Sequence, residues 1–198
     1  MRVGTRVGVA VALVAVAAAG CTTRDPGTAG PGTTTTAASS SASVPPRPKD
    51  LSATADPCSL LTQDQMAQMK VSSSAQGPGW DQTGAATSCT YQVTDPVKYT
   101  MTVRLDPKRG VDYWLNYTGT WVTRSATVSS FPAIQIVTKG EDWNAPAGHL
   151  CDTIVSIADG KELYAGVLPH SGDLSNTQMC DLSKQLASLA LATLQTKS

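Results

Sequence analysis

The sequence lacks most of the side chains and motifs on which enzymes depend. It has only two histidines, His149 and His170, and it contains no Gly-x-Ser-x-Gly elbow, Ser-x-x-Lys pair, phosphate-binding loop or His-Glu-x-x-His motif. Basic and acidic side chains balance at 15 each, and no cluster of basic residues is present to hold a nucleic acid. These absences weigh against catalysis and nucleic-acid binding, and they favour a binding or accessory role.

Potential metal ligands and phenylalanine are also scarce. No Cys-x-x-Cys pair occurs, and His149-x-Cys151 is an isolated pair of potential ligands, so the sequence does not predict a metal site. Phe131 is the single phenylalanine, beside four tryptophans and five tyrosines. We therefore expect a core of Val, Ile, Leu and Ala with a few large aromatic side chains.

The longest apolar run lies at the N-terminus and is too short to cross a membrane. It covers residues 7–19, about 13 residues, whereas a spanning helix needs ~20. Arg2 and Arg6 precede the run, and small residues follow it up to Cys21, which is the three-part pattern of a secretory signal. The sequence therefore predicts a cleaved signal peptide over residues 1–20.

The segment before Cys21 resembles a bacterial lipobox. It reads Val16-Ala17-Ala18-Ala19-Gly20, with Ala18 at the position where Leu is common. In such proteins a peptidase cuts just before the cysteine, and the thiol carries a diacylglycerol whose palmitate-like chains hold the protein at the membrane. We expect this covalent lipid on Cys21, no other cofactor, and a position on the extracytoplasmic side of the cell membrane. The alternative is an ordinary signal that leaves Cys21 as a free thiol.

Residues 21–55 have the composition of a flexible tether. They consist largely of Thr, Ser, Ala, Gly and Pro, and such a segment has too little apolar surface to offset the entropy lost on ordering. As a flexible coil the segment would span about 30–35 Å. The sequence therefore predicts a lipidated Cys21 on a disordered tether, followed by an extracytoplasmic domain over residues 56–198.

Four cysteines remain in the predicted domain, Cys58, Cys89, Cys151 and Cys180. An even number of cysteines in an exported chain indicates disulfides. Three pairings are possible, and we favour Cys58–Cys89 with Cys151–Cys180 because these bonds join segments that are close in sequence. Each bond would close a loop of about 30 residues and stabilise the fold by roughly 3–4 kcal/mol.

The apolar pattern over residues 56–198 predicts a single α+β domain. Alternation predicts strands over residues 88–93, 98–105, 120–128, 133–137, 152–158 and 162–168, and three- to four-residue spacing predicts helices over 60–70, 110–117 and 175–195. Ser59 or Thr62 is expected to cap the first helix, and residues 72–86 to form a polar loop. Asp159-Gly160 predicts a hairpin between the last two strands. The order of elements predicts an antiparallel sheet packed against the N- and C-terminal helices.

Two segments carry large aromatic residues in polar surroundings and are candidate binding loops. The first includes Glu141, Asp142, Trp143 and His149, and the second includes Trp80. Loops carry binding residues disproportionately, so two neighbouring exposed tryptophans could hold a sugar ring, a lipid or a partner protein. The alternative is that both tryptophans fill a core poor in phenylalanine, and that the carboxylates and the histidine lie in solvent.

Taken together, these motifs resemble a family of actinobacterial lipoproteins known as domain of unknown function thirty-five fifty-eight. The resemblance is carried by the lipobox, the tether, the Asp56-Pro57-Cys58-Ser59-Leu60-Leu61 segment and Cys89-x-Tyr91. The strand at Cys151 and the helix at Cys180 fit the same pattern, so the resemblance covers nearly all of the mature chain. It implies the location and architecture described above, and it implies no catalytic residue because the family has no established activity.

We therefore expect a membrane-anchored, extracytoplasmic lipoprotein that acts as a non-enzymatic binding or accessory protein of the cell envelope. Its partners would be the membrane, through the lipid, and an unidentified envelope ligand or protein, but no nucleic acid. One alternative is an envelope hydrolase acting on carbohydrate or lipid, which paired carboxylates or a histidine near a buried serine would favour. Another is a structural or immunity-type interaction module, which a flat apolar surface patch would favour.

Overall fold

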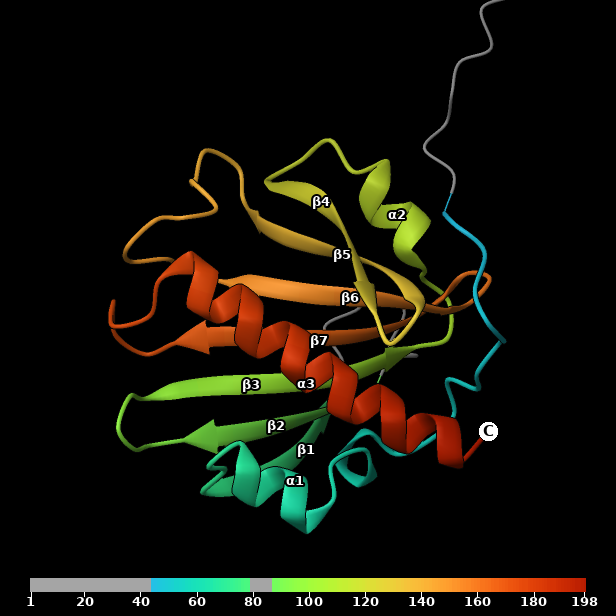
Figure 1. Ribbon diagram of the computed structural model, residues 1–198, viewed down its shortest axis with the longest axis horizontal. Coiled ribbons are helices and arrows are strands. Elements are labelled where there is room, and N and C mark those ends of the chain that lie inside the picture. The colour runs from blue at the N-terminus through green and yellow to red at the C-terminus, as the bar shows by residue number, and fades with distance from the viewer. Residues whose placement is uncertain (1–43, 79–86) are drawn as a thin grey trace, which may run out of the picture. The chain divides into compact units, whose positions relative to one another are not determined.

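Seven strands form one antiparallel sheet in the order β1-β2-β3-β7-β6-β5-β4. The computed structural model describes residues 44–78 and 87–198, and Figure 1 shows these strands lying side by side. The strands are β1 (Ser73–Pro78), β2 (Thr87–Val93), β3 (Tyr99–Asp106), β4 (Trp121–Val128), β5 (Phe131–Thr138), β6 (Cys151–Ala158) and β7 (Lys161–Pro169). Six of them lie where alternation predicts strands, and Asp159-Gly160 joins β6 to β7 in the predicted hairpin.

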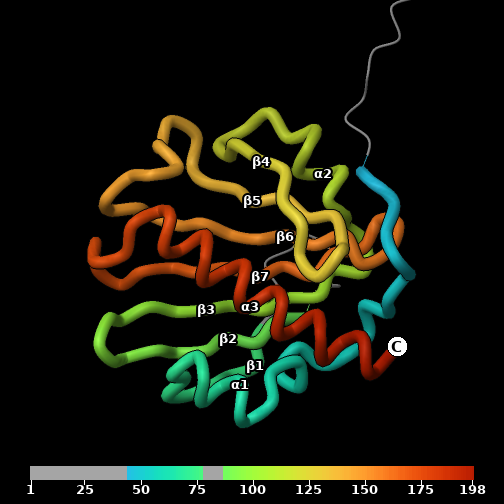
Figure 2. The backbone as a smooth tube through the Cα atoms, viewed as in Figure 1, coloured from blue at the N-terminus to red at the C-terminus, as the bar shows by residue number. Residues whose placement is uncertain are grey.

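The C-terminal helix α3 (Asn176–Thr196) covers one face of the sheet, as Figures 1 and 2 show. The Ser175 hydroxyl accepts a hydrogen bond from the backbone N–H of Gln178, and the Gln178 side chain accepts one from the backbone of Ser175, so the helix begins with a capping box. The other helical elements are η1 (Pro57–Ser59), α1 (Gln63–Gln68) and α2 (Val111–Leu115). With a helix near each end of the domain and an antiparallel sheet, the predicted α+β fold is confirmed.

The two faces of the sheet carry different side chains. In β3 the odd-numbered side chains from Tyr99 to Leu105 belong to the main core, which α3 covers. The even-numbered side chains from Thr100 to Asp106 point to the opposite face, because successive side chains of a strand alternate. On this opposite face, which we call the second face, Trp114 of α2 packs in a smaller apolar cluster. The second face therefore combines polar strand positions with a local apolar cover.

Two disulfides attach the outer elements to the main-core side of the sheet. Cys58 in η1 is bonded to Cys89 in β2, and Cys151 in β6 is bonded to Cys180 in α3. The pairings are those favoured from sequence proximity, with separations of 31 and 29 residues. Both bonds therefore restrain the N-terminal turn and the last helix against the strands beneath them.

The expected polar loop over residues 72–86 was wrong in its first half. Residues 73–78 form the edge strand β1, which pairs with β2 from Ser73↔Gln92 to Pro78↔Thr87. The strand has no apolar alternation because an edge strand can be held by backbone hydrogen bonds without burying one of its faces. Residues 79–86, which include Trp80, lie outside the described part of the chain.

The first helix is shorter than the apolar spacing predicts. It begins after Thr62, whose hydroxyl accepts from the backbone N–H of Gln65 while the Gln65 side chain accepts from the backbone of Thr62. Of the two expected caps, Thr62 is therefore the one used. Leu60 and Leu61 are buried but precede the helix, so their apolar side chains reach the core from the turn before α1.

The expected tether boundary at residue 55 was too late. Leu51 is 3% exposed, and its backbone N–H donates to the carbonyl of Ile157 at 2.7 Å. Arg47 forms ion pairs with Asp50 and Asp159. A buried leucine and the ion pair to Asp159 fix residues 44–55 to the domain, although their Pro- and Ser-containing composition resembles that of the preceding segment. We call residues 44–55 the strap.

The predicted signal peptide, Cys21 and the first part of the predicted tether fall within residues 1–43, outside the described part of the chain. None of the described helices has the length and apolar character that crossing a membrane requires.

Candidate ligand-binding site

The predicted binding loop between β5 and β6 is tied to the start of α3. The Glu141 carboxylate pairs with the exposed His149 and accepts a hydrogen bond from Asn176 Nδ2 at 3.3 Å. The same amide nitrogen donates to the backbone carbonyl of Asp142 at 2.6 Å. Asn176 is fully buried, so these hydrogen bonds attach the loop to the first residue of α3.

Trp143 in the same loop packs inward. Its ring is half-buried against the main core, and the guanidinium of Arg124 lies 4.3 Å from the ring centroid. This packing favours the interpretation in which Trp143 fills the core. The structure brings Glu141, Asp142 and His149 together in the loop, but it does not test their predicted role in binding.

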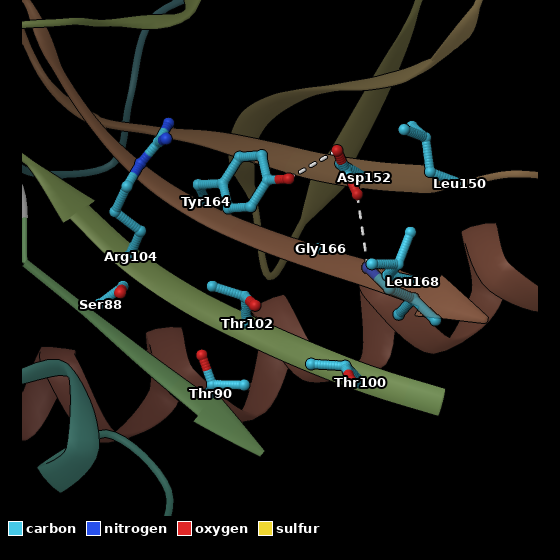
Figure 3. Close-up of a pocket in the computed structure, with 11 residues that line it drawn as sticks. Ser88, Thr90, Thr100, Thr102, Arg104, Leu150, Asp152, Tyr164, Gly166 and Leu168 are labelled. Carbon is cyan, nitrogen blue, oxygen red and sulfur yellow. Dashed lines mark hydrogen bonds between the residues drawn. The ribbon is translucent and has the colours of Figure 1, made fainter. Parts of the chain in front are cut away.

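A cavity of about 250 Å³ opens on the second face of the sheet. Its lining comes from four adjacent strands, β2, β3, β7 and β6, and from Leu150 just before β6. Figure 3 shows serine and threonine side chains on β2 and β3 at one side, and Tyr164 and Asp152 at the other. None of these residues was a candidate from the sequence.

One end of the cavity is built on a buried ion pair. Arg104 Nη2 donates to Glu162 Oε1 at 2.7 Å, and the indole Nε1 of Trp114 donates to Glu162 Oε2 at 2.7 Å. Arg104 is 5% exposed and Glu162 is 0% exposed. Helix α2 therefore supplies, through Trp114, a second donor that holds the glutamate in place beside the arginine.

The wall next to this ion pair is a second hydrogen-bonded pair. The Tyr164 hydroxyl donates to Asp152 Oδ2 at 2.6 Å, and the backbone N–H of Val167 donates to Asp152 Oδ1 at 3.3 Å. The guanidinium of Arg104 lies 4.5 Å from the centroid of the Tyr164 ring. The tyrosine ring thus connects the two pairs by a cation–π contact at one face and a hydrogen bond at its hydroxyl.

Burial shifts the pKa values of both carboxyl groups upward. It raises the pKa of Asp152 to about 7, against the opposing hydrogen bonds from Tyr164 and Val167 and the charge of Arg104. It raises the pKa of Glu162 to about 6, against the charge of Arg104 and the hydrogen bond from Trp114. Burial and the neighbouring Asp152 also raise the pKa of Tyr164 well above its ordinary value. Near neutral pH Tyr164 is therefore protonated, and Asp152 is present in both its protonated and its ionised form.

Several hydrogen-bonding groups around the cavity have no partner in the described part of the chain. Arg104 Nε is buried without an acceptor. Thr90 and Thr102 face each other across β2 and β3 as register partners, and neither hydroxyl makes a hydrogen bond to another described residue. Buried or half-buried polar groups are usually paired, so these three groups are available to a ligand.

At the mouth of the cavity, the structure contains one hydroxyl–imidazole pair. Thr100 Oγ1 lies 2.7 Å from His170 Nε2, and Thr100 also donates to Gln92 at 3.0 Å. His170 has no carboxylate partner among the residues that the structure describes. The distance is that of a nucleophile and its base, but the hydroxyl proton of Thr100 is donated to Gln92, and His170 lacks the third group that orients such a base.

The sequence contained one signal that could have led to this site. Arg104 and Glu162 are charges of opposite sign within two predicted strands, and such charges can pair where the two strands are neighbours. Finding the site also requires knowing that β3 lies beside β7, so that Arg104 and Tyr164 are register partners. No group of three or more His, Cys, Asp or Glu side chains in residues 44–78 and 87–198 is arranged to hold a metal ion.

These features define a disulfide-linked α+β domain that carries a cavity on the sheet face opposite its long helix. Disulfides of this kind indicate an oxidising or extracytoplasmic environment. The chain belongs to the family described as Protein of unknown function (DUF3558), whose model matches residues 16–193. The family expected from the motifs is therefore confirmed. Comparisons with curated proteins and with solved structures found no match.

Proposed function

We propose that the protein is an extracytoplasmic lipoprotein, anchored through Cys21, that binds a small molecule in the cavity on the second face without transforming it. The observation that carries this proposal is the cavity of about 250 Å³, walled by two hydrogen-bonded pairs and containing unpaired donors. Ligand sites typically combine apolar walls with a few fixed polar groups. The lipobox and the disulfides support the location.

Binding is favoured over catalysis because the buried carboxylates are engaged in holding the walls. Each oxygen of Glu162 and each oxygen of Asp152 accepts a hydrogen bond from a group of the protein itself. A general acid or base must instead reach the substrate. The envelope hydrolase remains the second candidate, and it rests on the Thr100–His170 pair. Turnover that His170→Ala abolishes would replace the binding proposal by this one.

The anchor is tested by metabolic labelling. Cells expressing the full chain are grown with labelled palmitate, and the protein is recovered from the membrane fraction. We expect label in the wild-type chain, and loss of both label and membrane retention in Cys21→Ser. Export without label would leave the domain extracytoplasmic but remove the lipoprotein part of the proposal.

The binding site is tested by native mass spectrometry of the exported chain after exposure to an envelope extract. We expect one reproducible added mass. Thr102→Leu should reduce it, because the longer side chain extends into the cavity that Thr102 lines. Thr123→Leu is the matched control, since Thr123 lies on β4 at the far edge of the sheet and does not line the cavity. Equal adducts in both variants would place the ligand elsewhere.

A further inference from the structure

We infer that the ligand of the second-face cavity is a small uncharged molecule, largely apolar, that presents a carbonyl or hydroxyl oxygen to Arg104. The inference rests on the proposed function, because it assumes that the cavity is a ligand site. Three observations carry it: the unpaired donors, the balance of charges around the cavity, and the nature of its walls.

The unpaired groups call for hydrogen-bond acceptors on the ligand. Arg104 is 5% exposed. Its Nη2 is paired with Glu162, and its Nε has no acceptor in the described part of the chain. Asp152, in contrast, already receives one donor at each oxygen. Because the wall lacks an acceptor for a buried N–H rather than a donor for a carboxylate, the missing partner is an oxygen.

The surrounding charges disfavour a charged ligand. Arg104 is balanced by Glu162 at 2.7 Å, and the neighbouring Arg109 is balanced by Asp106 at 3.2 Å. Asp152 is the remaining charged group, and burial already favours its neutral form. An anion would enter a region with no uncompensated positive charge, and a cation would meet a carboxyl group that already accepts one hydrogen bond at each oxygen and whose neutral form is favoured by burial. A neutral oxygen satisfies Arg104 without burying a new charge.

The walls and floor indicate a mostly apolar ligand of limited size. The side chains of Leu150 and Leu168 line one end, and Leu168 is 52% exposed at the rim. The floor is formed by Thr90 and Thr102, whose hydroxyls can donate to or accept from a ligand. A volume of about 250 Å³ lies below the usual range for drug-sized ligands, about 300–1,000 Å³. A single substituted ring is the size of molecule that fits.

Three planar probes of the same shape test this inference: benzamide, which is neutral, benzoate, which is anionic, and benzamidinium, which is cationic. Each is titrated into the isotopically labelled mature chain near neutral pH, and binding is followed by backbone amide chemical shifts. We expect saturable shifts with benzamide at Thr102, Gly166 and Leu168, which line the cavity. The two charged probes should bind at least about tenfold more weakly, because each would bury an unpaired charge.

An isosteric pair of variants links the binding to the cavity floor. Thr102→Val removes the hydroxyl at nearly constant volume and should weaken benzamide binding by about threefold to tenfold. Thr123→Val, on the distant strand β4, should leave the affinity unchanged. Both variants are checked for the wild-type amide spectrum outside the site, so a folding defect is distinguished from a binding defect.

The remaining outcomes separate this inference from the proposed function. Stronger binding of benzoate or benzamidinium at the same amides would overturn the neutral ligand class and keep the cavity as a binding site. Shifts confined to other residues, or no shifts with any probe, would overturn the inference. The adduct experiment with the envelope extract then decides independently whether the cavity binds a ligand of another class.

Discussion

The Tyr164 hydroxyl donates a hydrogen bond to Asp152 Oδ2 across 2.6 Å, from β7 to the neighbouring strand β6. The backbone N–H of Val167 donates to the other carboxylate oxygen. The side chain is thus fixed from two sides, while burial raises its pKa to about 7. The protonation of Asp152 therefore connects the wall of the cavity with the stability of the sheet.

The folded protein is expected to lose stability as pH rises through the titration of Asp152. The group titrates near 3.8 when unfolded and at about 7 when folded. The folded state therefore holds the proton more tightly, and this advantage is lost as pH rises through the folded pKa. Urea titrations should show the free energy of unfolding falling by about 3 kcal/mol from this group between about pH 5 and about pH 8.

Asp152→Asn is the matched control for this pH dependence. Asparagine has the same shape and can still exchange hydrogen bonds with Tyr164 and Val167, but it does not titrate. The variant should lack the part of the decline that belongs to Asp152. Glu162, whose pKa is also raised, to about 6, would still contribute a decline of the same sign at lower pH. An unchanged profile in the variant would assign the decline to other groups.

Breaking the buried ion pair should be costly, and removing it altogether should cost less. Glu162→Gln leaves Arg104 buried without its counter-charge, so we expect a loss of about 3–5 kcal/mol in the free energy of unfolding. The double variant Arg104→Met, Glu162→Gln removes both charges and keeps an acceptor for Trp114. It should be more stable than Glu162→Gln alone. The opposite order would mean that the glutamine pairs with the arginine adequately.

Leu51 tests whether the strap is part of the folded domain. Its side chain is 3% exposed within the main core, so Leu51→Ala should lower the free energy of unfolding by about 2–4 kcal/mol. Thr54→Ala, at an exposed position of the same segment, should change it by less than about 0.5 kcal/mol. If both variants were as stable as the wild type, residues 44–55 would behave as the tether that their composition suggests.

Trp143→Ala distinguishes the two interpretations of the loop between β5 and β6. A ring that packs against the core and under the guanidinium of Arg124 contributes to stability, so we expect a loss of about 2 kcal/mol. His149→Ala, at an exposed position, should be nearly neutral in the same urea titration. Unchanged stability in Trp143→Ala would return this residue to the set of candidate binding residues.

The main-core side of the sheet was predictable because local patterns determine it. Strict alternation in β3, the Asp159-Gly160 turn and the apolar stripe of α3 each depend on residues a few positions apart. The disulfide pairing was accessible for the same reason. Errors occurred where tertiary contacts override composition, as in β1, which is held by pairing with β2, and in the strap, which is held by Leu51 and Arg47.

The cavity was not predictable because it depends on which strands are neighbours. The polar side chains of β3 alternate with apolar ones as they would on any solvent-facing strand. They become a cavity wall only because β3 pairs with β7, which places Arg104 opposite Tyr164 across 60 positions of sequence. A prediction from single-strand patterns has no access to such a pairing, and it therefore directed attention to loops instead.

The strap determines where a mechanical load would enter the domain. Leu51 is hydrogen-bonded to β6, and Arg47 holds Asp159 at the tip of the β6–β7 hairpin. A pull along the chain from residue 44 would therefore act first on the centre of the sheet, which Cys151–Cys180 joins covalently to α3. A domain tethered through this segment would take up shear from cell-envelope movement on the two central strands β6 and β7 rather than on the edge strands β1 and β4.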